Sequence, residues 1–199
     1  PMKLRFVFVA ILLLVTQSVF SQTNANEFKV VGYYVPSIPA EQIPIDLLTH
    51  INFAFAIPAK TGDTLEPLRD PEPLKKLVKY VHKNNKQVFI SIGGWGIGDG
   101  GGDDTRFHKM AERPEGRRTF VKNVMKFVRT SEVDGVDLDW EYPDEDRRSA
   151  DDYVALVSEL GDSLHAKGKK LTAAVISYGK KGYGTKKEAL EKMDWVNLM

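Results

Sequence analysis

The chain reads DGVDLDWEYP over residues 134–143, where acidic and apolar side chains alternate. In an extended strand every second side chain shares a face, so Asp137, Asp139 and Glu141 point one way while the residues between them point the other. The alternation therefore predicts a strand over residues 135–141. Three acids on the inner face of a buried strand are unfavourable unless they are paired, so this run also predicts a functional site.

This strand is one of several short β-rich runs that alternate with helical periods. We expect strands at residues 30–35, 50–57, 87–92, 135–141, 170–177 and 196–199, and helices at residues 71–85, 114–128, 151–166 and, more weakly, 185–193. This order predicts an α/β fold with a parallel sheet covered by helices. It fits about the first six strands of a (β/α)8 TIM barrel of about 250 residues, so we expect a truncated barrel. A doubly wound open sheet fits less well, because no glycine fingerprint follows the first strand.

Residues 1–21 are predicted to be a signal peptide. Lys3 and Arg5 form a basic start, residues 6–15 form an apolar core, and Val19 and Ser21 supply a cleavage site. The apolar run is too short to span a bilayer, although an uncleaved membrane anchor is an alternative. We therefore expect the protein to be secreted or periplasmic.

The composition limits the partners. With 42% hydrophobic and 28% charged residues, the chain has the balance of an ordinary folded domain. Its net charge of +1 offers no basic field for nucleic acid or for an anionic membrane. The chain has no cysteine, so the fold is held without disulfides. We expect the full-length protein to be a monomer without a cofactor. Its partner should be uncharged, and we expect no membrane contact after the signal peptide is cleaved.

The acidic run ends where barrel enzymes keep their active sites, at the carboxyl end of a strand. Neighbouring acids on this face would be ~6.7 Å apart at Cα, so they would oppose one another's ionisation. At least one should keep its proton near neutral pH, as a general acid must. A solvated acidic strand end is one alternative. A calcium or magnesium site is another, but no histidine or helical spacing supports it, and we expect no metal.

A second pattern ends the preceding strand, where residues 91–95 read SIGGW. By strand parity Ser91 and Gly93 face inward, where the hydroxyl could bind an acid and the missing side chain leaves room for a ligand. Trp95 offers a flat apolar face at the rim. The same residues could instead be plain turn geometry. Residues 96–104, rich in glycine and aspartate, predict a mobile surface loop.

Residues 134–143 resemble the DxxDxDxE signature of family 18 glycoside hydrolases, the chitinases and their relatives. Residues 91–95 are similar to the SxGG strand end of that family. Residues 32–34, 52–56 and 195–199 resemble its first, second and sixth strands. The resemblance covers essentially the whole mature chain, and it implies an incomplete catalytic barrel over residues 22–199.

The resemblance implies retaining hydrolysis of β-1,4-linked N-acetylglucosamine polymers, chitin or chitooligosaccharides, with endo action expected. Glu141 would protonate the glycosidic oxygen, and the 2-acetamido oxygen of the substrate would be the nucleophile. Asp139 would orient the acetamido group and share a proton with Asp137. Ser91 would hold Asp137, and Asp134 would be a further supporting residue.

By the same resemblance, a set of aromatic and small residues would bind the sugars: Tyr33, Gly93, Gly94, Trp95, Tyr142 and Met199. Each of the larger side chains could instead pack in a core. Two other functions stay open. One is an endo-β-N-acetylglucosaminidase acting on N-glycans, and the other is a non-catalytic, lectin-like chitin-binding barrel, which usually lacks the acid that Glu141 provides.

The family pattern also continues beyond the last residue. It implies a tyrosine and an aspartate within three residues after Met199, followed by a seventh and an eighth strand. We therefore expect residues 1–199 alone to be inactive and poorly stable, because an unclosed barrel exposes strand edges and apolar faces.

Overall fold

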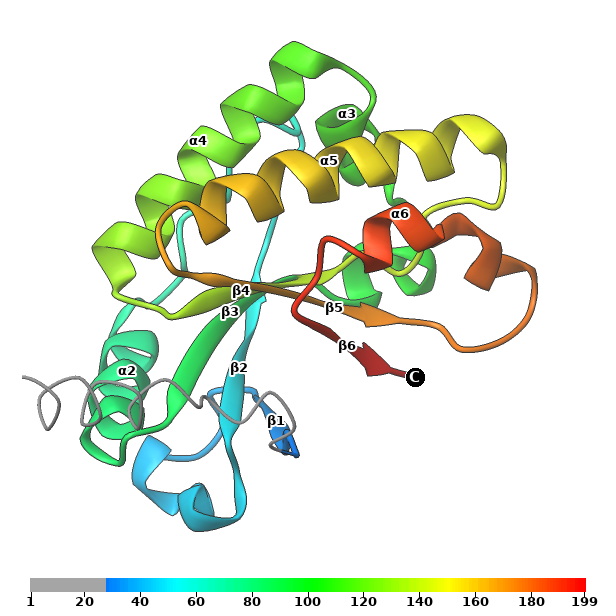
Figure 1. The fold of residues 1–199 in the computed structure, drawn as a ribbon. Helices are drawn as coiled ribbons and strands as arrows, with labels where there is room; N and C mark the ends of the chain where they lie inside the picture. The colour runs from blue at the N-terminus through cyan, green and yellow to red at the C-terminus, as the bar shows by residue number, and fades with distance from the viewer. Residues whose placement is uncertain (1–27) are drawn as a thin grey trace, which may run out of the picture.

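The computed structural model describes residues 28–199. Six strands form one sheet in which each strand runs parallel to the next in chain order (Figure 1). The strands are β1 (Val31–Tyr34), β2 (His50–Ala56), β3 (Gln87–Gly93), β4 (Gly135–Asp139), β5 (Lys170–Val175) and β6 (Trp195–Leu198). The predicted parallel α/β sheet is confirmed, whereas the predicted signal peptide at residues 1–21 lies outside the described residues.

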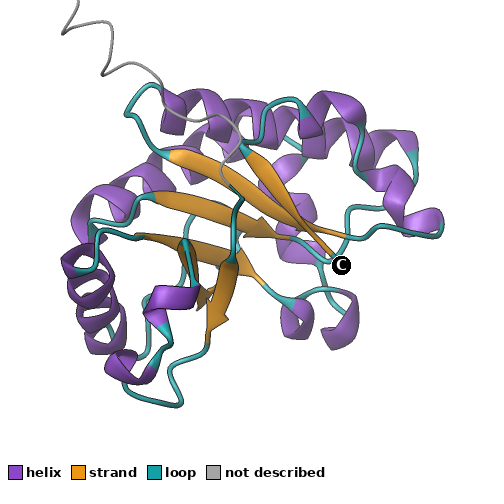
Figure 2. Ribbon diagram, turned by 60° about the horizontal axis from the view of Figure 1, so that its bottom comes forward, coloured by secondary structure: helices purple, strands orange, loops and turns teal. Residues whose placement is uncertain are grey.

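The sheet curls, and the helices lie on its outer side (Figure 2). The helices are α2 (Glu72–Lys83), α3 (Thr105–Ala111), α4 (Pro114–Ser131), α5 (Arg147–His165) and α6 (Lys187–Leu190). Single 3-10 turns are η1 (Ala40–Gln42), η2 (Ile45–Leu47), η3 (Trp95–Ile97), η4 (Asp99–Gly101) and η5 (Lys180–Gly184). Within residues 28–199, no helix is long and apolar enough to cross a membrane. A curled parallel sheet inside a layer of helices is the arrangement expected for part of a (β/α)8 barrel.

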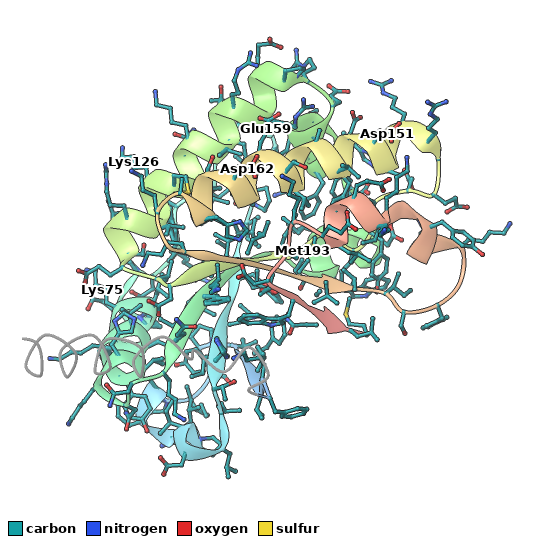
Figure 3. The ribbon with its side chains drawn as sticks, viewed as in Figure 1. Lys75, Lys126, Asp151, Glu159, Asp162 and Met193 are labelled. Carbon is teal, nitrogen blue, oxygen red and sulfur yellow. The ribbon has the colours of Figure 1, made fainter. Side chains whose placement is uncertain are left out.

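The helices pack through apolar stripes that the sequence period predicts. The buried residues of α2 are Leu74, Leu77, Val78 and Val81, spaced as one face of a helix requires. On the outer side, Arg117 of α4 donates to Glu159 of α5 at 2.7 Å, and Figure 3 shows Glu159 between these two helices. Packing against the sheet and a polar contact between neighbouring helices together hold the outer layer.

The largest differences from the sequence expectation are in three helices. Helix α6 covers only Lys187–Leu190 rather than residues 185–193. Helix α5 begins at Arg147 rather than at residue 151, because Asp146 caps it by accepting a hydrogen bond from the Ser149 backbone N–H at 2.9 Å. Helix α3 was not predicted at all. It is one short segment between a glycine-rich stretch and a proline, and it buries Phe107 and Met110 against the core.

The cap at Asp146 predicts a measurable loss of stability. Replacing Asp146 with Ala leaves the Ser149 N–H without its acceptor, so the free energy of unfolding should fall by ~1 kcal/mol. Urea denaturation of the complete protein measures this change. The matched control is Glu145→Ala, which removes an exposed acid one position earlier and should leave stability almost unchanged. Equal losses in the two variants would contradict the capping role.

Candidate active site

The three acids of the alternating run gather at the carboxyl end of β4. Asp137 and Asp139 belong to the strand, whereas Glu141, predicted to be its last residue, lies two residues beyond its end. Their exposed fractions are 0%, 4% and 8%, so all three are buried. Catalytic residues of barrel enzymes lie at this end of the strands, which makes the cluster the candidate active site.

Asp137 is held by side chains from four other strands. Its Oδ2 accepts hydrogen bonds from Tyr33 Oη and Ser91 Oγ, both at 2.8 Å. Its Oδ1 accepts from Thr172 Oγ1 at 2.7 Å and from Asn197 Nδ2 at 3.0 Å. Burial raises the pKa of Asp137 overall, and the four hydrogen bonds offset part of this effect. Asp137 therefore connects β1, β3, β5 and β6 to β4.

Asp139 has a different environment from Asp137. Its Oδ1 is buried and has no hydrogen-bond partner among residues 28–199. Burial, then the charge of Glu141 and then that of Asp137, raise the pKa of Asp139 to about 8. Asp139 therefore keeps a proton at neutral pH. The family resemblance implied a proton shared with Asp137, whereas here Glu141 is the carboxyl group that affects Asp139 most strongly.

The backbone of Glu141 is fixed by the loop that follows β3. The Asp99 N–H donates to the Glu141 carbonyl at 2.7 Å. A Cβ at Gly98 would lie 2.3 Å from that same carbonyl oxygen, so only glycine permits the approach. Residues 96–104, expected to be a mobile surface loop, contain the end of the turn η3 and the turn η4. Sequence reasoning missed Gly98, although the glycine-rich composition was its visible signal.

Gly93 and Gly94 both contact the carbonyl oxygen of Asp139. Gly93 has a φ of 127°, and a Cβ there would lie 2.1 Å from the Asp139 carbonyl oxygen. The Gly94 N–H donates to that oxygen at 2.9 Å. The missing side chain at Gly93 was expected to leave room for a ligand. Its observed reason is the close approach of β3 and β4.

The other residues predicted to bind sugars are three aromatic residues and Met199. Trp95 is 54% exposed, and its ring centroid lies 6.3 Å from that of Tyr142. Tyr142 is partly buried, and its pKa is raised to about 12, first by burial and then by Glu141. Tyr33 is 42% exposed and contacts Asp137 through its hydroxyl group. Met199 lies at the end of β6, where its backbone N–H donates to the Val175 carbonyl at 2.9 Å.

Asp134 does not join this cluster. It precedes β4, where its Oδ2 accepts from the Val88 N–H at 2.9 Å and lies 2.8 Å from His82 Nε2. Asp134 thus supports the junction of β3 and β4 at the end of the strands opposite Glu141. It was grouped with the other acids by the motif, and the structure separates it from them.

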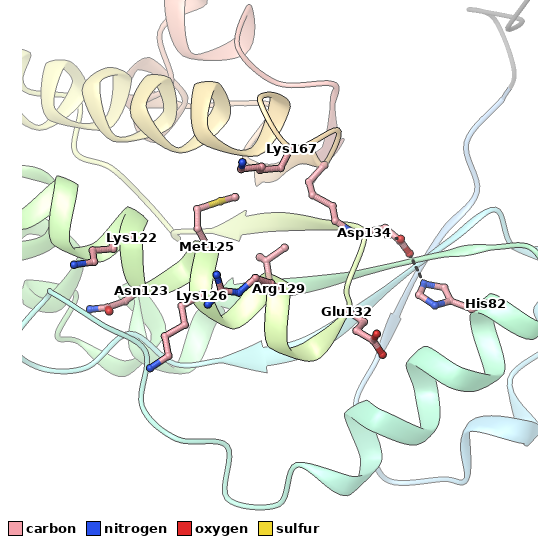
Figure 4. A pocket seen from close by; sticks show the side chains of 11 residues that line it. His82, Lys122, Asn123, Met125, Lys126, Arg129, Glu132, Asp134 and Lys167 are labelled. Carbon is pink, nitrogen blue, oxygen red and sulfur yellow. Dashed lines mark hydrogen bonds and ion pairs between the residues drawn. The ribbon is translucent and has the colours of Figure 1, made fainter.

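A hollow of about 610 Å³ also lies at this opposite end (Figure 4). Its lining is mainly basic, and includes Lys122, Lys126, Arg129 and Lys167. Arg129 lies in the last turn of α4 and Lys167 follows α5, where the helix dipole favours positive charge. Residues 28–199 contain no group of three or more His, Asp or Glu side chains that could hold a metal. The buried acids therefore remain the best candidate for catalysis.

Known proteins resemble this chain in sequence and in fold. The chain is 32% identical over 200 aligned residues to Probable chitinase 10 of Drosophila melanogaster, covering 88% of this chain and 8% of that protein. It is 25% identical to the Group II chitinase catalytic domain 2 of Ostrinia furnacalis, with a TM-score of 0.76 over 86% of this chain and 50% of that one. The chitinase-like agglutinin RobpsCRA of Robinia pseudoacacia shares the fold, with 24% identity and a TM-score of 0.75 over 85% of this chain and 54% of that one.

The chain thus spans about half of these solved chains and a smaller part of the fly protein. The family model for glycosyl hydrolases family 18 matches residues 29–199. This match includes every strand of the sheet and all three buried acids. It bears out the resemblance of the sequence motifs, and the chain belongs to glycosyl hydrolase family 18.

Proposed function

We propose that the protein hydrolyses β-1,4-linked N-acetylglucosamine polymers, chitin or chitooligosaccharides. The observation that carries this proposal is the pair of buried carboxyl groups, Asp139 and Glu141, at the carboxyl end of β4, where the pKa of Asp139 is raised. A glycosidase needs a carboxyl group that holds a proton next to the scissile bond. Membership of family 18 and the chitinase names of the relatives support the same substrate class.

In the proposed mechanism the proton held by Asp139 passes to Glu141, which gives it to the glycosidic oxygen as the bond to C1 breaks. The acetamido oxygen of the same sugar attacks C1 and forms a cyclic oxazolinium ion. Water then attacks C1, the ring oxygen–C1 bond of the oxazolinium opens, and the Glu141 carboxylate takes the proton of that water. Two inversions at C1 give retention of configuration.

Asp139 and Asp137 assist through charge and hydrogen bonding. The buried Oδ1 of Asp139 is free of protein partners among residues 28–199, so it can accept the acetamido N–H of the substrate. Once its proton has passed to Glu141, the Asp139 carboxylate stabilises the positive oxazolinium ion in a water-poor site, while Asp137 supports Asp139 from the same strand. Each acid thus has a separate role in the same step.

The surrounding residues would bind the sugars. Trp95 and Tyr142 present partly exposed rings next to Glu141, and aromatic faces suit the apolar side of a sugar ring. Tyr33, Gly94 and Met199 would complete these subsites. We also propose that the enzyme acts internally on the polymer and that it is exported as a monomer.

Two other functions share this fold. A non-catalytic, lectin-like protein is suggested by the fold similarity to the chitinase-like agglutinin of Robinia pseudoacacia. An endo-β-N-acetylglucosaminidase acting on N-glycans would use the same acids. The presence of Asp137, Asp139 and Glu141 favours an enzyme. Products released from chitin oligomers and from a high-mannose glycoprotein separate the three possibilities.

Replacing Glu141 with Gln removes the proton donor but keeps the size of the side chain. In the complete protein the turnover of chitooligosaccharides should fall by at least ~10²-fold, because general acid catalysis contributes on this scale. Binding measured by calorimetry should be largely kept. The exposed acid of the same segment provides a control, and Glu145→Gln should keep wild-type turnover. Unchanged turnover in Glu141→Gln would exclude the assigned acid.

The raised pKa of Asp139 predicts how stability depends on pH. The folded value of about 8 exceeds the ordinary value of 3.8, so between these pH values the folded state holds a proton that the unfolded state has lost. The contribution of Asp139 to stability should therefore be most favourable below the ordinary value and fall as the pH rises towards 8.

Asp139→Asn, which resembles the protonated acid, should remove this part of the pH dependence. Urea denaturation of the complete wild-type and variant proteins at several pH values measures the difference between them. If the two stability curves run parallel across this range, Asp139 does not hold the proton.

A further inference from the structure

Asn197 joins the two outermost strands of the described sheet to the acid cluster. It lies on β6, and its Nδ2 is 3.0 Å from Asp137 Oδ1 and 3.1 Å from Tyr33 Oη on β1. These partners are 60 and 164 residues away in the sequence. Neither β1 nor β4 is a hydrogen-bonded neighbour of β6 in the sheet. The side chain therefore makes a contact across the inside of the curled sheet.

The chemistry of the partners fixes the orientation of the Asn197 amide. An ionised carboxylate only accepts hydrogen bonds, so the amide nitrogen rather than the amide oxygen must face Asp137. The second N–H of the same amide then points to the Tyr33 oxygen. Asn197 thus uses both of its donors within the cluster.

The hydroxyl of Tyr33 is directed in turn. Its oxygen accepts from Asn197, so its hydrogen is free to point at Asp137 Oδ2, 2.8 Å away. Burial and the charge of Asp137 raise the pKa of Tyr33, which keeps this hydrogen in place. The hydrogen bonds therefore run in one direction, from Asn197 to Tyr33 and from Tyr33 to Asp137.

The acceptor capacity of Asp137 is then fully used. A carboxylate offers about four lone-pair sites. Tyr33 and Ser91 occupy two of them at Oδ2, and Thr172 and Asn197 occupy two at Oδ1. A proton could sit on Asp137 only if one donor turned away. A hydroxyl can do so by rotating alone, whereas Asn197 would have to flip its whole amide and lose its donor bonds to both Asp137 and Tyr33.

We propose that Asn197 is a positioning residue that keeps Asp137 an acceptor and so confines the proton of the acid cluster to Asp139 and Glu141. The proposal rests on the proposed hydrolase function for its kinetic consequence. Loss of the Asn197 donors makes Asp137 easier to protonate. The proton can then leave the pair next to the scissile bond, and activity at acidic pH falls.

The kinetic test is the pH dependence of kcat/KM for chitooligosaccharides in the complete protein. Asn197→Leu removes both donors at similar size, and the midpoint of the acid limb should move up by about one pH unit, the scale of one hydrogen bond to a charged group. Thr172→Val removes one donor at nearly constant shape and should move the limb in the same direction. Thr172→Ser keeps the hydroxyl and should restore the wild-type profile.

The matched control is Asn123→Leu. Asn123 lies on α4 and donates to the Asp63 carbonyl at 2.8 Å. The same substitution there removes a hydrogen bond without changing the contacts of the acids. The acid limb of this variant should stay at the wild-type pH. A shift in Asn123→Leu equal to that in Asn197→Leu would show a general loss of structure and overturn the proposal.

A second measurement separates this inference from the proposed function. Carbon-13 NMR of labelled aspartate carboxyl groups follows protonation of Asp137 without any substrate. Its titration should move to higher pH in Asn197→Leu and in Thr172→Val. If the wild-type protein cleaves no chitooligosaccharide but the titration moves, the hydrolase function fails and the positioning role stands. If the titration moves in neither variant, the positioning role is overturned, and Thr172→Val alone decides should Asn197→Leu fail to fold.

Discussion

The rest of the site depends on the hydrogen bonding of one buried carboxyl group, that of Asp137. Its two oxygens accept from side chains on β1, β3, β5 and β6. A buried acid is unfavourable unless its lone pairs are satisfied, so these strands must keep their positions for Asp137 to stay inside. The curvature of the sheet is therefore tied to the chemistry at its carboxyl end.

Close backbone contacts add a second constraint around the acids. Gly93 lies against the Asp139 carbonyl, and Gly98 lies against the Glu141 carbonyl, at distances that exclude a Cβ. Both acids are thereby fixed through their main chains, while Asp137 is fixed through its side chain. The side chains of Asp139 and Glu141 keep the freedom to meet a substrate, because the contacts that position them do not occupy their carboxyl groups.

Strand parity was sufficient to predict the strand around Asp139 and the inward direction of Ser91, because the period of two is a local property of the chain. Family resemblance then supplied the barrel. Asn197 could not be predicted, since its partners are 60 and 164 residues away and meet it only after the sheet has curled. Asp134 was grouped with the acids because it is their neighbour in the sequence motif. In the structure, the length of β4 separates Asp134 from Glu141.

Asp137 and Asp139 show that burial alone does not set the role of an acid. Both lie on one strand, both are at most 4% exposed, and burial raises the pKa of each. Four donors surround Asp137, whereas a second carboxyl group, that of Glu141, stands beside Asp139. The donors favour the charged form of one acid, and the neighbouring charge favours the neutral form of the other. The division of roles along β4 is therefore set by donors from other strands at Asp137 and by Glu141, just beyond β4, at Asp139.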